Sequence, residues 1–525
     1  MLHTDLKMPG GIMHTTIFSA TTIGVDAHIV QVEVDITFGL VNFYLVGLPD
    51  TAIKESSHRV SSAIKNSGFR MPAKRIVINL APADLKKVGT LFDLPIAIGI
   101  LHADGALDIP KTYKDETLWL GELSLDGSIR PIKGALAIAY DAHKLGKKRI
   151  VLPKANAQEA ALIKDIEVIG VEHLTDVVAL LRGEKTIAPT QSSFDRFIAN
   201  EQKHTIDFDQ VKGQEQAKRA LQIAAAGRHN ILFIGSPGSG KTMLAKRLAT
   251  IMPPMHFDEV VHTSKIYSIS GKLNNKPLVS QRPFRSPHHT ISQAGLVGGG
   301  SCPQPGEISL AHNGILFLDE LTEFKRDTLE VLRQPLEHKQ VHISRVRHTV
   351  NYPASFLLVA ALNPCPCGFW GDKKRACVCS PQQINRYINK LSGPLLDRID
   401  LQVHVQSVEY DTIKQKDKGV SSHELYQQVR RALNKQYKRF GSLERHNQSM
   451  QSDEIERYCT LTADAEELIK KAFAKLNLSM RGYHKIIKVA RTIADLDDKE
   501  VIDTPHMREA IMYRSLDQAL EKQRS

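Results

Sequence analysis

Short runs of apolar residues recur through the chain, and each is bounded by glycine, proline or polar residues. Runs of about four to eight such residues predict strands that are buried on both faces, as in a parallel sheet. A stretch whose apolar residues recur at helical spacing, and which Gly68 ends, predicts a helix instead. The strands are expected at residues 75–80, 148–152, 230–235, 314–320 and 356–362, and the helix at 51–67.

The C-terminal part of the chain has a different pattern. After residue 405, apolar positions recur every three or four residues, which is the spacing of one face of a helix. Helices are expected at residues 422–440, 462–476, 481–496 and 504–520. We therefore expect a helical lid after a core of strands and helices.

These patterns divide the chain into four parts and predict an α/β fold. Residues 12–181 alternate strands with helices and predict an α/β domain. Residues 182–204 are polar, contain proline and predict a linker. Residues 205–405 predict a second α/β core with a parallel sheet, and residues 406–525 predict its helical lid. A length of 525 residues suits several domains.

Composition and charge add expectations about partners and location. The net charge of +12 favours a polyanionic partner, although a basic soluble protein could carry it without one. No apolar run reaches the roughly 18 residues of a membrane span, and the first residues lack the apolar core of a secretory signal. Six cysteines are too few for a disulfide scaffold in this chain, so we expect a cytoplasmic protein without a membrane partner.

The stretch after the strand at 230–235 has the chemistry of a phosphate-binding loop. It matches the pattern G-x-x-x-x-G-K-[ST], with a strand before it and a helix after it. Backbone N–H groups of such a loop surround phosphate oxygens, the lysine reaches the outer phosphates, and the threonine hydroxyl ligates Mg²⁺. A tight turn without a ligand is the alternative. The residues expected to bind nucleotide are Gly235, Ser236, Pro237, Gly238, Ser239, Gly240, Lys241 and Thr242.

Two further strands end in polar residues that suit a nucleotide site. The strand at 314–320 ends in Asp319, which would hold Mg²⁺, and Glu320, which would act as the general base on the attacking water. The strand at 356–362 delivers Asn363, whose amide could sense the γ-phosphate or position the water. The alternatives are two acids that cap a strand and an asparagine in a turn.

Two segments have the composition of nucleic-acid contacts. Residues 336–353 alternate branched apolar and basic residues and predict a two-stranded hairpin. Near its expected tip, three basic residues could hold a DNA backbone without reading sequence, whereas a solvated basic face is the alternative. Residues 281–300 predict a second loop, made mobile by glycines, in which His288 and His289 could instead form a metal pair. The basic residues of the hairpin are Arg345, Arg347 and His348.

Four cysteines form two C-x-C pairs that are nine residues apart. Four thiolates in one loop could close a tetrahedral zinc site and staple the segment between Asn363 and Arg398. The spacing departs from the usual C-x-x-C knuckle, so reduced thiols or a redox-labile pair are the alternatives. The four residues are Cys365, Cys367, Cys377 and Cys379.

Four motifs stand out in the second half of the chain: RSPHHTIS at 285–292, PGEISLAHNG at 305–314, NPCPCG at 363–368 and GPLLDRID at 393–400. They resemble the magnesium-chelatase-like AAA+ family, and within it the ComM/YifB branch. The resemblance implies a homohexameric ring with ATP between subunits and a hairpin that points into the central pore. It places Arg398 as the arginine finger that reaches a neighbour's site and Arg481 as the second sensor, where surface ion pairs are the alternative.

The first domain resembles the Lon protease-type fold, in residues 84–95, 121–134 and 148–153. The positions of the serine and lysine of the Lon catalytic dyad hold Leu91 and Leu136 in this chain. Neither leucine can attack a peptide bond. The resemblance therefore implies a shared scaffold without proteolysis, used for assembly or for holding a partner.

The family resemblance implies an ATPase of the DNA helicase type. Its substrate would be single-stranded or branched DNA, its reaction branch migration during natural transformation, and its partners recombination proteins. The second interpretation is a magnesium-chelatase motor subunit that remodels a protein partner, which the Lon-like domain and the C-x-C pairs disfavour. A protease is the third interpretation, and the two leucines disfavour it.

Overall fold

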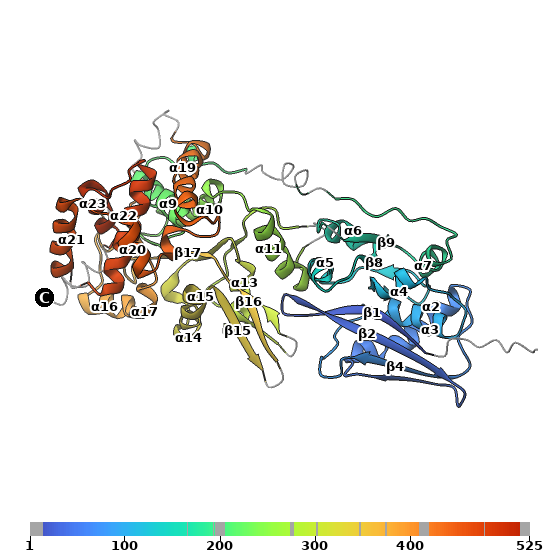
Figure 1. Ribbon diagram of the computed structural model, residues 1–525. Coiled ribbons are helices and arrows are strands. Elements are labelled where there is room, and N and C mark those ends of the chain that lie inside the picture. Colours follow the sequence, from blue (N-terminus) through green and yellow to red (C-terminus); the bar gives the residue numbers. More distant parts are fainter. Residues whose placement is uncertain are drawn as a thin grey trace, which may run out of the picture. The chain divides into compact units, whose positions relative to one another are not determined.

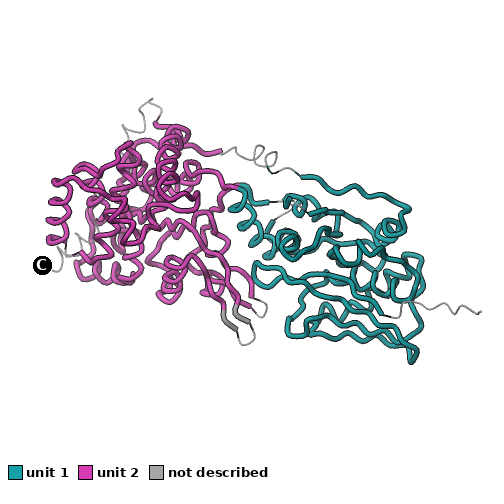
Figure 2. The backbone as a smooth tube through the Cα atoms, viewed as in Figure 1, with its two compact units in different colours: residues 1–200, 257–280 teal, residues 201–256, 281–525 magenta. Residues whose placement is uncertain are grey.

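The computed structural model describes residues 14–164, 166–192, 194, 205–273, 278–300, 303–345, 348–372, 375–408, 419–476 and 478–514. Figure 2 shows two compact units, one of residues 1–200 and 257–280 and the other of residues 201–256 and 281–525. The chain therefore leaves the second unit after His256 and returns to it at Gln281. The sequence patterns predicted one crossing near the linker and not this excursion.

The first unit contains a four-stranded sheet in the order β1-β2-β4-β3 and a three-stranded parallel sheet in the order β5-β8-β9. Strands β4 and β8 are those predicted at residues 75–80 and 148–152, so the alternation of apolar runs located them. The strands are β1 (His14–Ile23), β2 (Asp26–Thr37), β3 (Asn42–Val46), β4 (Arg75–Ala81), β5 (Thr117–Trp119), β6 (Glu122–Leu123), β7 (Ile129–Arg130), β8 (Arg149–Pro153) and β9 (Glu167–Val171).

Helix α11 (Phe257–Ile269) packs on α5 (Ala135–Lys144) inside the first unit (Figure 1). Lys265 Nζ lies 3.2 Å from a carboxylate oxygen of Asp141, and the Ser268 hydroxyl accepts the Gly134 N–H at 3.1 Å. Leu91 and Leu136 are both buried in the core of this unit. Its other helices are α1 (Thr51–Lys54), α2 (Ser56–Asn66), α3 (Asp93–Ala103), α4 (Lys111–Asp115), α6 (Lys154–Ala160) and α7 (Leu174–Leu181).

The second unit is built on a five-stranded parallel sheet in the order β11-β14-β17-β10-β18. Every residue of β10, β14 and β17 is buried, which explains the unbroken apolar runs that predicted these strands. The strands are β10 (Ile231–Ile234), β11 (Phe284–Arg285), β14 (Ile315–Leu318), β17 (Leu357–Leu362) and β18 (Leu401–His404).

Helices cover this sheet and form the predicted lid, and one hydrophobic core joins the sheet to the lid. Helix α19 (Ser422–Phe440) begins at a capping box of Ser421 and Glu424 and ends at Gly441 in the left-handed region. The others are η1 (Phe208–Gln210), α9 (Glu215–Gly227), α10 (Lys241–Ile251), η3 (Asn447–Ser449), α20 (Ser452–Tyr458), α21 (Ala463–Lys475), α22 (Met480–Leu496) and α23 (Thr504–Met512). No helix among the described residues is both long and apolar enough to cross a membrane.

The helix expected at residues 504–520 ends earlier than predicted. Helix α23 stops at Met512 because the next residues pair with β18 instead. The Tyr513 carbonyl accepts the Gln402 N–H at 2.8 Å, and Arg514 forms a parallel bridge with Gln402. Residues beyond 514 lie outside the described residues.

Two hairpins and several short helices are inserted around the sheet. The predicted hairpin is present as β15 (Gln340–Arg345) and β16 (His348–Pro353), in the chain between β14 and β17. A smaller hairpin joins β12 (Gly298–Gly299) to β13 (Gln304–Pro305). The short helices are α12 (Gln293–Val297), α13 (Glu307–Leu310), η2 (Leu321–Glu323), α14 (Arg326–Glu330), α15 (Arg333–His338), α16 (Pro381–Ile388) and α17 (Gly393–Leu396).

Candidate functional site

The predicted phosphate loop connects β10 to α10 at the carboxyl edge of the second unit's sheet. Gly238 and Gly240 have φ values of +77° and +93°, which residues with side chains rarely adopt. A Cβ atom on Gly235 would clash with the carbonyl oxygen of Val405. The backbone path itself therefore requires glycine at these three positions, and Ser236, Pro237 and Ser239 complete the loop.

Lys241 is folded back over this loop. Its Nζ donates to the carbonyl oxygens of Gly235 and Ser236 at 2.7 and 3.0 Å and lies 3.3 Å from Asn363 Oδ1. Burial lowers the pKa of Lys241, while the charges of Asp319 and Glu320 oppose that shift. The structure thus brings together groups from three separate stretches of the sequence around one ammonium group.

Thr242 and Asp319 meet beside Lys241. The Thr242 hydroxyl donates to Asp319 Oδ2 at 2.6 Å. A hydroxyl and a carboxylate are oxygen donors of the kind that Mg²⁺ prefers, so these two residues fit the predicted metal site. The start of α10 adds N–H groups and the positive end of its dipole, which favour bound phosphate.

Glu320 follows Asp319 in the left-handed region, with a φ of +51°. Its N–H donates to Asp319 Oδ1 at 2.9 Å, which fixes the turn at the end of β14. Its carboxylate reaches the segment after β11, where Oε2 lies 3.1 Å from His289 Nδ1. The His289 ring stacks on His288 with 4.1 Å between ring centroids. The sequence patterns did not predict this contact with the expected general base.

Within the part of the chain that the structure describes, His288 and His289 belong to no larger group of metal ligands. Among the described residues, the only cluster of three or more potential ligands is that of the four cysteines. His288 Nδ1 instead lies 2.9 Å from the Thr290 hydroxyl.

Arg398 and Arg481 lie outside the group around Lys241. Arg398 follows α17. Its guanidinium forms an ion pair with Glu337 of α15 and donates a hydrogen bond to the Pro394 carbonyl oxygen. Arg481 is exposed in the first turn of α22. The predicted roles of the two arginines at a subunit interface stay predictions.

A buried network connects the two elements that carry these arginines. The sequence patterns did not predict it. Asp400 lies 3.1 Å from Lys485 Nζ, one helical turn after Arg481 on α22. Burial raises the pKa of Asp400, but the charges of Lys485 and His229 outweigh burial and hold it well below its usual range. Asn230, just before β10, donates through Nδ2 to the Arg398 carbonyl at 2.9 Å. The signal in the sequence that could have indicated this network is Asn230, a polar residue at the start of a buried strand.

The four predicted cysteine ligands converge. Their sulfur atoms all lie within 4.8 Å of one another, and Cys365 Sγ is 3.3 Å from Cys367 Sγ and 3.6 Å from Cys377 Sγ. The backbone N–H groups of Phe369 and Val378 lower the pKa of the Cys367 thiol to about 6. The group, completed by Cys379, has the ligand number and proximity of a metal site.

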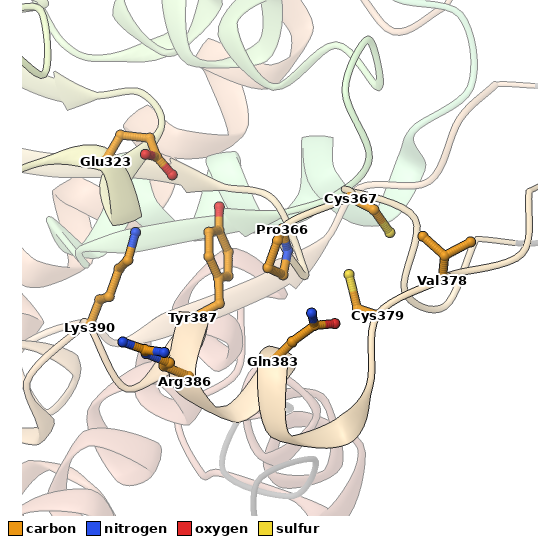
Figure 3. Close-up of a pocket in the computed structure, with 9 residues that line it drawn as sticks. All are labelled: Glu323, Pro366, Cys367, Val378, Cys379, Gln383, Arg386, Tyr387 and Lys390. Atoms are coloured by element: carbon orange, nitrogen blue, oxygen red, sulfur yellow. The ribbon is translucent and has the colours of Figure 1, made fainter.

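A cavity of about 600 Å³ opens beside this cluster (Figure 3). Cys367 and Cys379 line it from one side, and α16 lines it through Gln383, Arg386 and Tyr387. The Tyr387 hydroxyl is 2.5 Å from the Thr322 hydroxyl, two residues after Glu320. The cysteine loop and α16 are therefore attached to the strand end that carries the two acids.

Two of the predicted DNA-binding residues, Arg345 and His348, lie at the end of the β15–β16 hairpin. Arg345 pairs with His348 as the last pair of its ladder. Arg347 lies outside the described residues. The hairpin follows η2, α14 and α15 after β14 and leads into the start of β17, the strand that ends before Asn363 and pairs with β14.

Three protein-family models match the chain: subunit ChlI of Mg-chelatase at residues 32–156, magnesium chelatase subunit ChlI at 207–413, and its C-terminal part at 419–514. The competence protein ComM of Haemophilus influenzae is 45% identical over 509 residues, which cover 96% of this chain and 98% of the relative. The chain belongs to the ComM/YifB branch of the magnesium-chelatase-like AAA+ family. A protein named YifB from Escherichia coli is 44% identical over 514 residues, which cover 97% of this chain and 98% of that relative.

The comparisons also include a Lon protease. An archaeal Lon protease from Archaeoglobus fulgidus is 42% identical over 54 residues, which are 10% of this chain and 9% of the relative. The predicted family and the fold class, a Lon-like α/β domain followed by an AAA+ core with a helical lid, are confirmed. Membership implies ATP and Mg²⁺ as cofactors, which Lys241, Thr242 and Asp319 fit.

Proposed function

We propose that this chain is an ATP hydrolase that drives a hexameric motor on DNA, of the helicase and branch-migration type, during recombination in natural transformation. The observation that carries the proposal is the place of the basic hairpin. It is inserted between β14, which ends at Asp319 and Glu320, and β17, which ends at Asn363. Because β14 and β17 pair directly, a load on the hairpin would act on both strands of the site.

The residues of the site have separate tasks in this proposal. Lys241 exchanges its bonds to loop carbonyls for bonds to the outer phosphates, and the loop N–H groups surround them. Glu320 accepts a proton from the attacking water, and Asn363 orients that water. Thr242 and Asp319 would hold Mg²⁺, which would supply positive charge to the phosphates. Arg398 supplies a positive charge to the neighbour's site, and Arg481 contacts the nucleotide from the lid.

DNA as the substrate is supported by charge and by a relative. The chain has a net charge of +12, and Arg345, Arg347 and His348 lie within four consecutive residues of the sequence. In a ring these side chains would repeat in each subunit and hold a phosphate backbone irrespective of sequence. The name of the Haemophilus relative connects it with competence. We propose single-stranded or branched DNA as the substrate, recombination proteins as partners and the cytoplasm as the location.

A magnesium-chelatase motor subunit is the second candidate, and the descriptions of the three matching family models favour it. Such a motor would use ATP hydrolysis to remodel a protein partner. Its ATPase would be indifferent to DNA, which separates the two candidates experimentally.

We further propose that the cysteine cluster holds structural zinc. The support is four thiols whose sulfur atoms lie within 4.8 Å of one another. Zinc favours tetrahedral thiolate sites of this kind, and closed four-ligand sites stabilise folds rather than catalyse. The cluster would thereby fix the loop between Asn363 and α16.

Strand separation of a forked duplex, together with DNA affinity at several salt concentrations, tests the motor proposal. The double variant Arg345→Ala, Arg347→Ala should bind DNA more weakly and lower the slope of log affinity against log salt by about one unit for each lost phosphate contact. The matched control is Lys470→Ala, Lys471→Ala, which removes the same charge from exposed positions of α21. Equal behaviour of the two double variants would contradict the role of the hairpin.

A further inference from the structure

The backbone around Arg398 is held by side chains from three other parts of the second unit. The consecutive carbonyl oxygens of residues 397, 398 and 399 each accept a hydrogen bond from one of them. The donors are Lys485 Nζ for the first carbonyl, Asn230 Nδ2 for the second at 2.9 Å and Arg514 Nη1 for the third at 3.2 Å. Because a side chain starts from its own backbone, these contacts limit where the Arg398 guanidinium can lie.

Lys485 contacts this segment at three points. Besides the carbonyl of residue 397, its Nζ lies 3.5 Å from the Ile399 carbonyl oxygen and 3.1 Å from Asp400 Oδ1. The two side chains of the ion pair are 19% and 3% exposed. Separating a buried ion pair is costly, because each charge has lost its hydration. The contacts of Lys485 on both sides of Arg398 therefore resist displacement.

The position of Lys485 in the lid connects two different ATP sites of the proposed ring. It lies on α22, one helical turn after Arg481. Arg481 is proposed to contact the nucleotide of its own subunit, and Arg398 that of a neighbour. Lys488, less than one turn further along the same helix, donates instead to the Gln448 carbonyl at 3.0 Å, inside the lid. The chain thus offers a second half-buried lysine on α22 that holds a different segment.

We propose that Lys485 is a positioning residue that holds Arg398 in the orientation required at the neighbour's ATP site. One ammonium group fixes the backbone before and after Arg398. Without it, the segment would shift, and a misplacement of about 1 Å can cost a catalytic group about two orders of magnitude in rate. The inference rests on the proposed function, because it names a residue that positions the proposed arginine finger.

Mixtures of inactive variants test this inference, because they show which half of the shared site is defective. Lys485→Met should bind ATP as the parent does and lower kcat by about a hundredfold. Mixed with Lys241→Ala, it should recover hydrolysis, since it keeps an intact phosphate loop and its partner keeps a well-placed Arg398. Mixed with Arg398→Ala, it should stay inactive, because neither variant supplies a working finger. Lys488→Met is the matched control, and its kcat should stay near that of the parent.

A second variant separates positioning from folding. Lys485→Met leaves the Asp400 charge buried without this ion-pair partner, which destabilises the fold. The double variant Lys485→Met, Asp400→Asn removes both charges and should unfold at a temperature closer to that of the parent. It still lacks the contacts with the two carbonyls, so it should show the same loss of kcat and the same rescue by Lys241→Ala.

Two outcomes would overturn the inference. One is a parental kcat in both Lys485 variants, and the other is rescue by Arg398→Ala but not by Lys241→Ala, which would place the defect in the chain's own site. The mixture of Arg398→Ala with Lys241→Ala tests the proposed function separately. If that mixture stays inactive although labelling shows subunit exchange, the shared site fails, and the role of Lys485 fails with it. If it recovers while the mixtures of the Lys485 variants with Lys241→Ala do not, only the positioning role fails.

Discussion

Lys241 and Glu320 act at different moments of the reaction, so their removal should have different effects. Lys241→Ala should abolish nucleotide binding, because Nζ is the charge that faces the outer phosphates. Glu320→Gln should bind ATP but not hydrolyse it, because the carboxylate acts only on the attacking water. Binding of a fluorescent ATP analogue and release of phosphate measure the two effects separately. Near-normal hydrolysis by either variant would refute the assignment of the site.

Glu159 in the first unit provides a prediction about pH. Burial raises its pKa from 4.5 to about 7, although Asn156 donates to its carboxylate and opposes the shift. A raised pKa means that the neutral form stabilises the folded state fully below pH 4.5, and that this contribution is lost as the pH rises to about 7. Glu159→Gln should therefore raise thermal stability at neutral pH, by on the order of 1 kcal/mol.

Thermal unfolding between pH 4.5 and 7 measures this effect. The difference between variant and parent should shrink at the acidic end. A difference that does not change with pH would mean that Glu159 does not titrate in this range. Glu172→Gln is a matched control, because the Glu172 side chain is 68% exposed.

At the scale of single residues, the sequence predicted what a local pattern can encode. The phosphate loop is one such case, because Gly235, Gly240, Lys241 and Thr242 stand at fixed spacing and their backbone and chemical requirements are local. The His289–Glu320 contact was not predictable in this way. It depends on how the loop after β11 packs on the end of β14, which no local pattern records.

The cysteine loop and α16 behave as one small element with its own apolar cluster. Cys365 packs with Ile384, Tyr387 and Ile388, apart from the main core. A structural metal would stabilise this element, because four thiolates bound to one ion cross-link the loop. Purified protein should contain about one zinc per chain, and Cys365→Ser, Cys377→Ser should release it and lower thermal stability. Elemental analysis of fresh, unchelated protein that finds no stoichiometric metal would refute this prediction.

Among the elements, those whose apolar residues recur at one clear spacing were predicted closely. The capping box and Gly441 delimit α19 at the predicted residues 422–440, and β17 matches the apolar run at 356–362 to within one residue. Two features were not predicted, because they depend on contacts between residues that are distant in sequence. Helix α11 packs in the first unit, although the chain on both sides belongs to the second. Residues Tyr513 and Arg514 pair with β18 rather than continuing a helix.

At the scale of the whole molecule, each ATP site of the proposed ring is built from residues of two neighbouring subunits. Arg398→Ala should fold and bind ATP but lose hydrolysis, since its charge is needed only by a neighbour. An equal mixture with Lys241→Ala should regain activity, because about one quarter of all interfaces in randomly mixed rings would combine two intact halves. Phosphate release by the mixture measures this. A mixture as inactive as its components, with subunit exchange shown by labelling, would contradict the shared site.

The central claim is that ATP hydrolysis by this chain is coupled to DNA through the β15–β16 hairpin. The most direct measurement is the ATPase rate of the nucleotide-loaded hexamer with and without forked DNA, for the parent and for Arg345→Ala, Arg347→Ala. We predict that DNA raises the parent rate several-fold, about 1 kcal/mol in the barrier, and that the double variant keeps its basal rate but loses the rise. A parent rate that is the same with and without DNA, in a verified hexamer that also fails to bind DNA at low salt, would contradict the account.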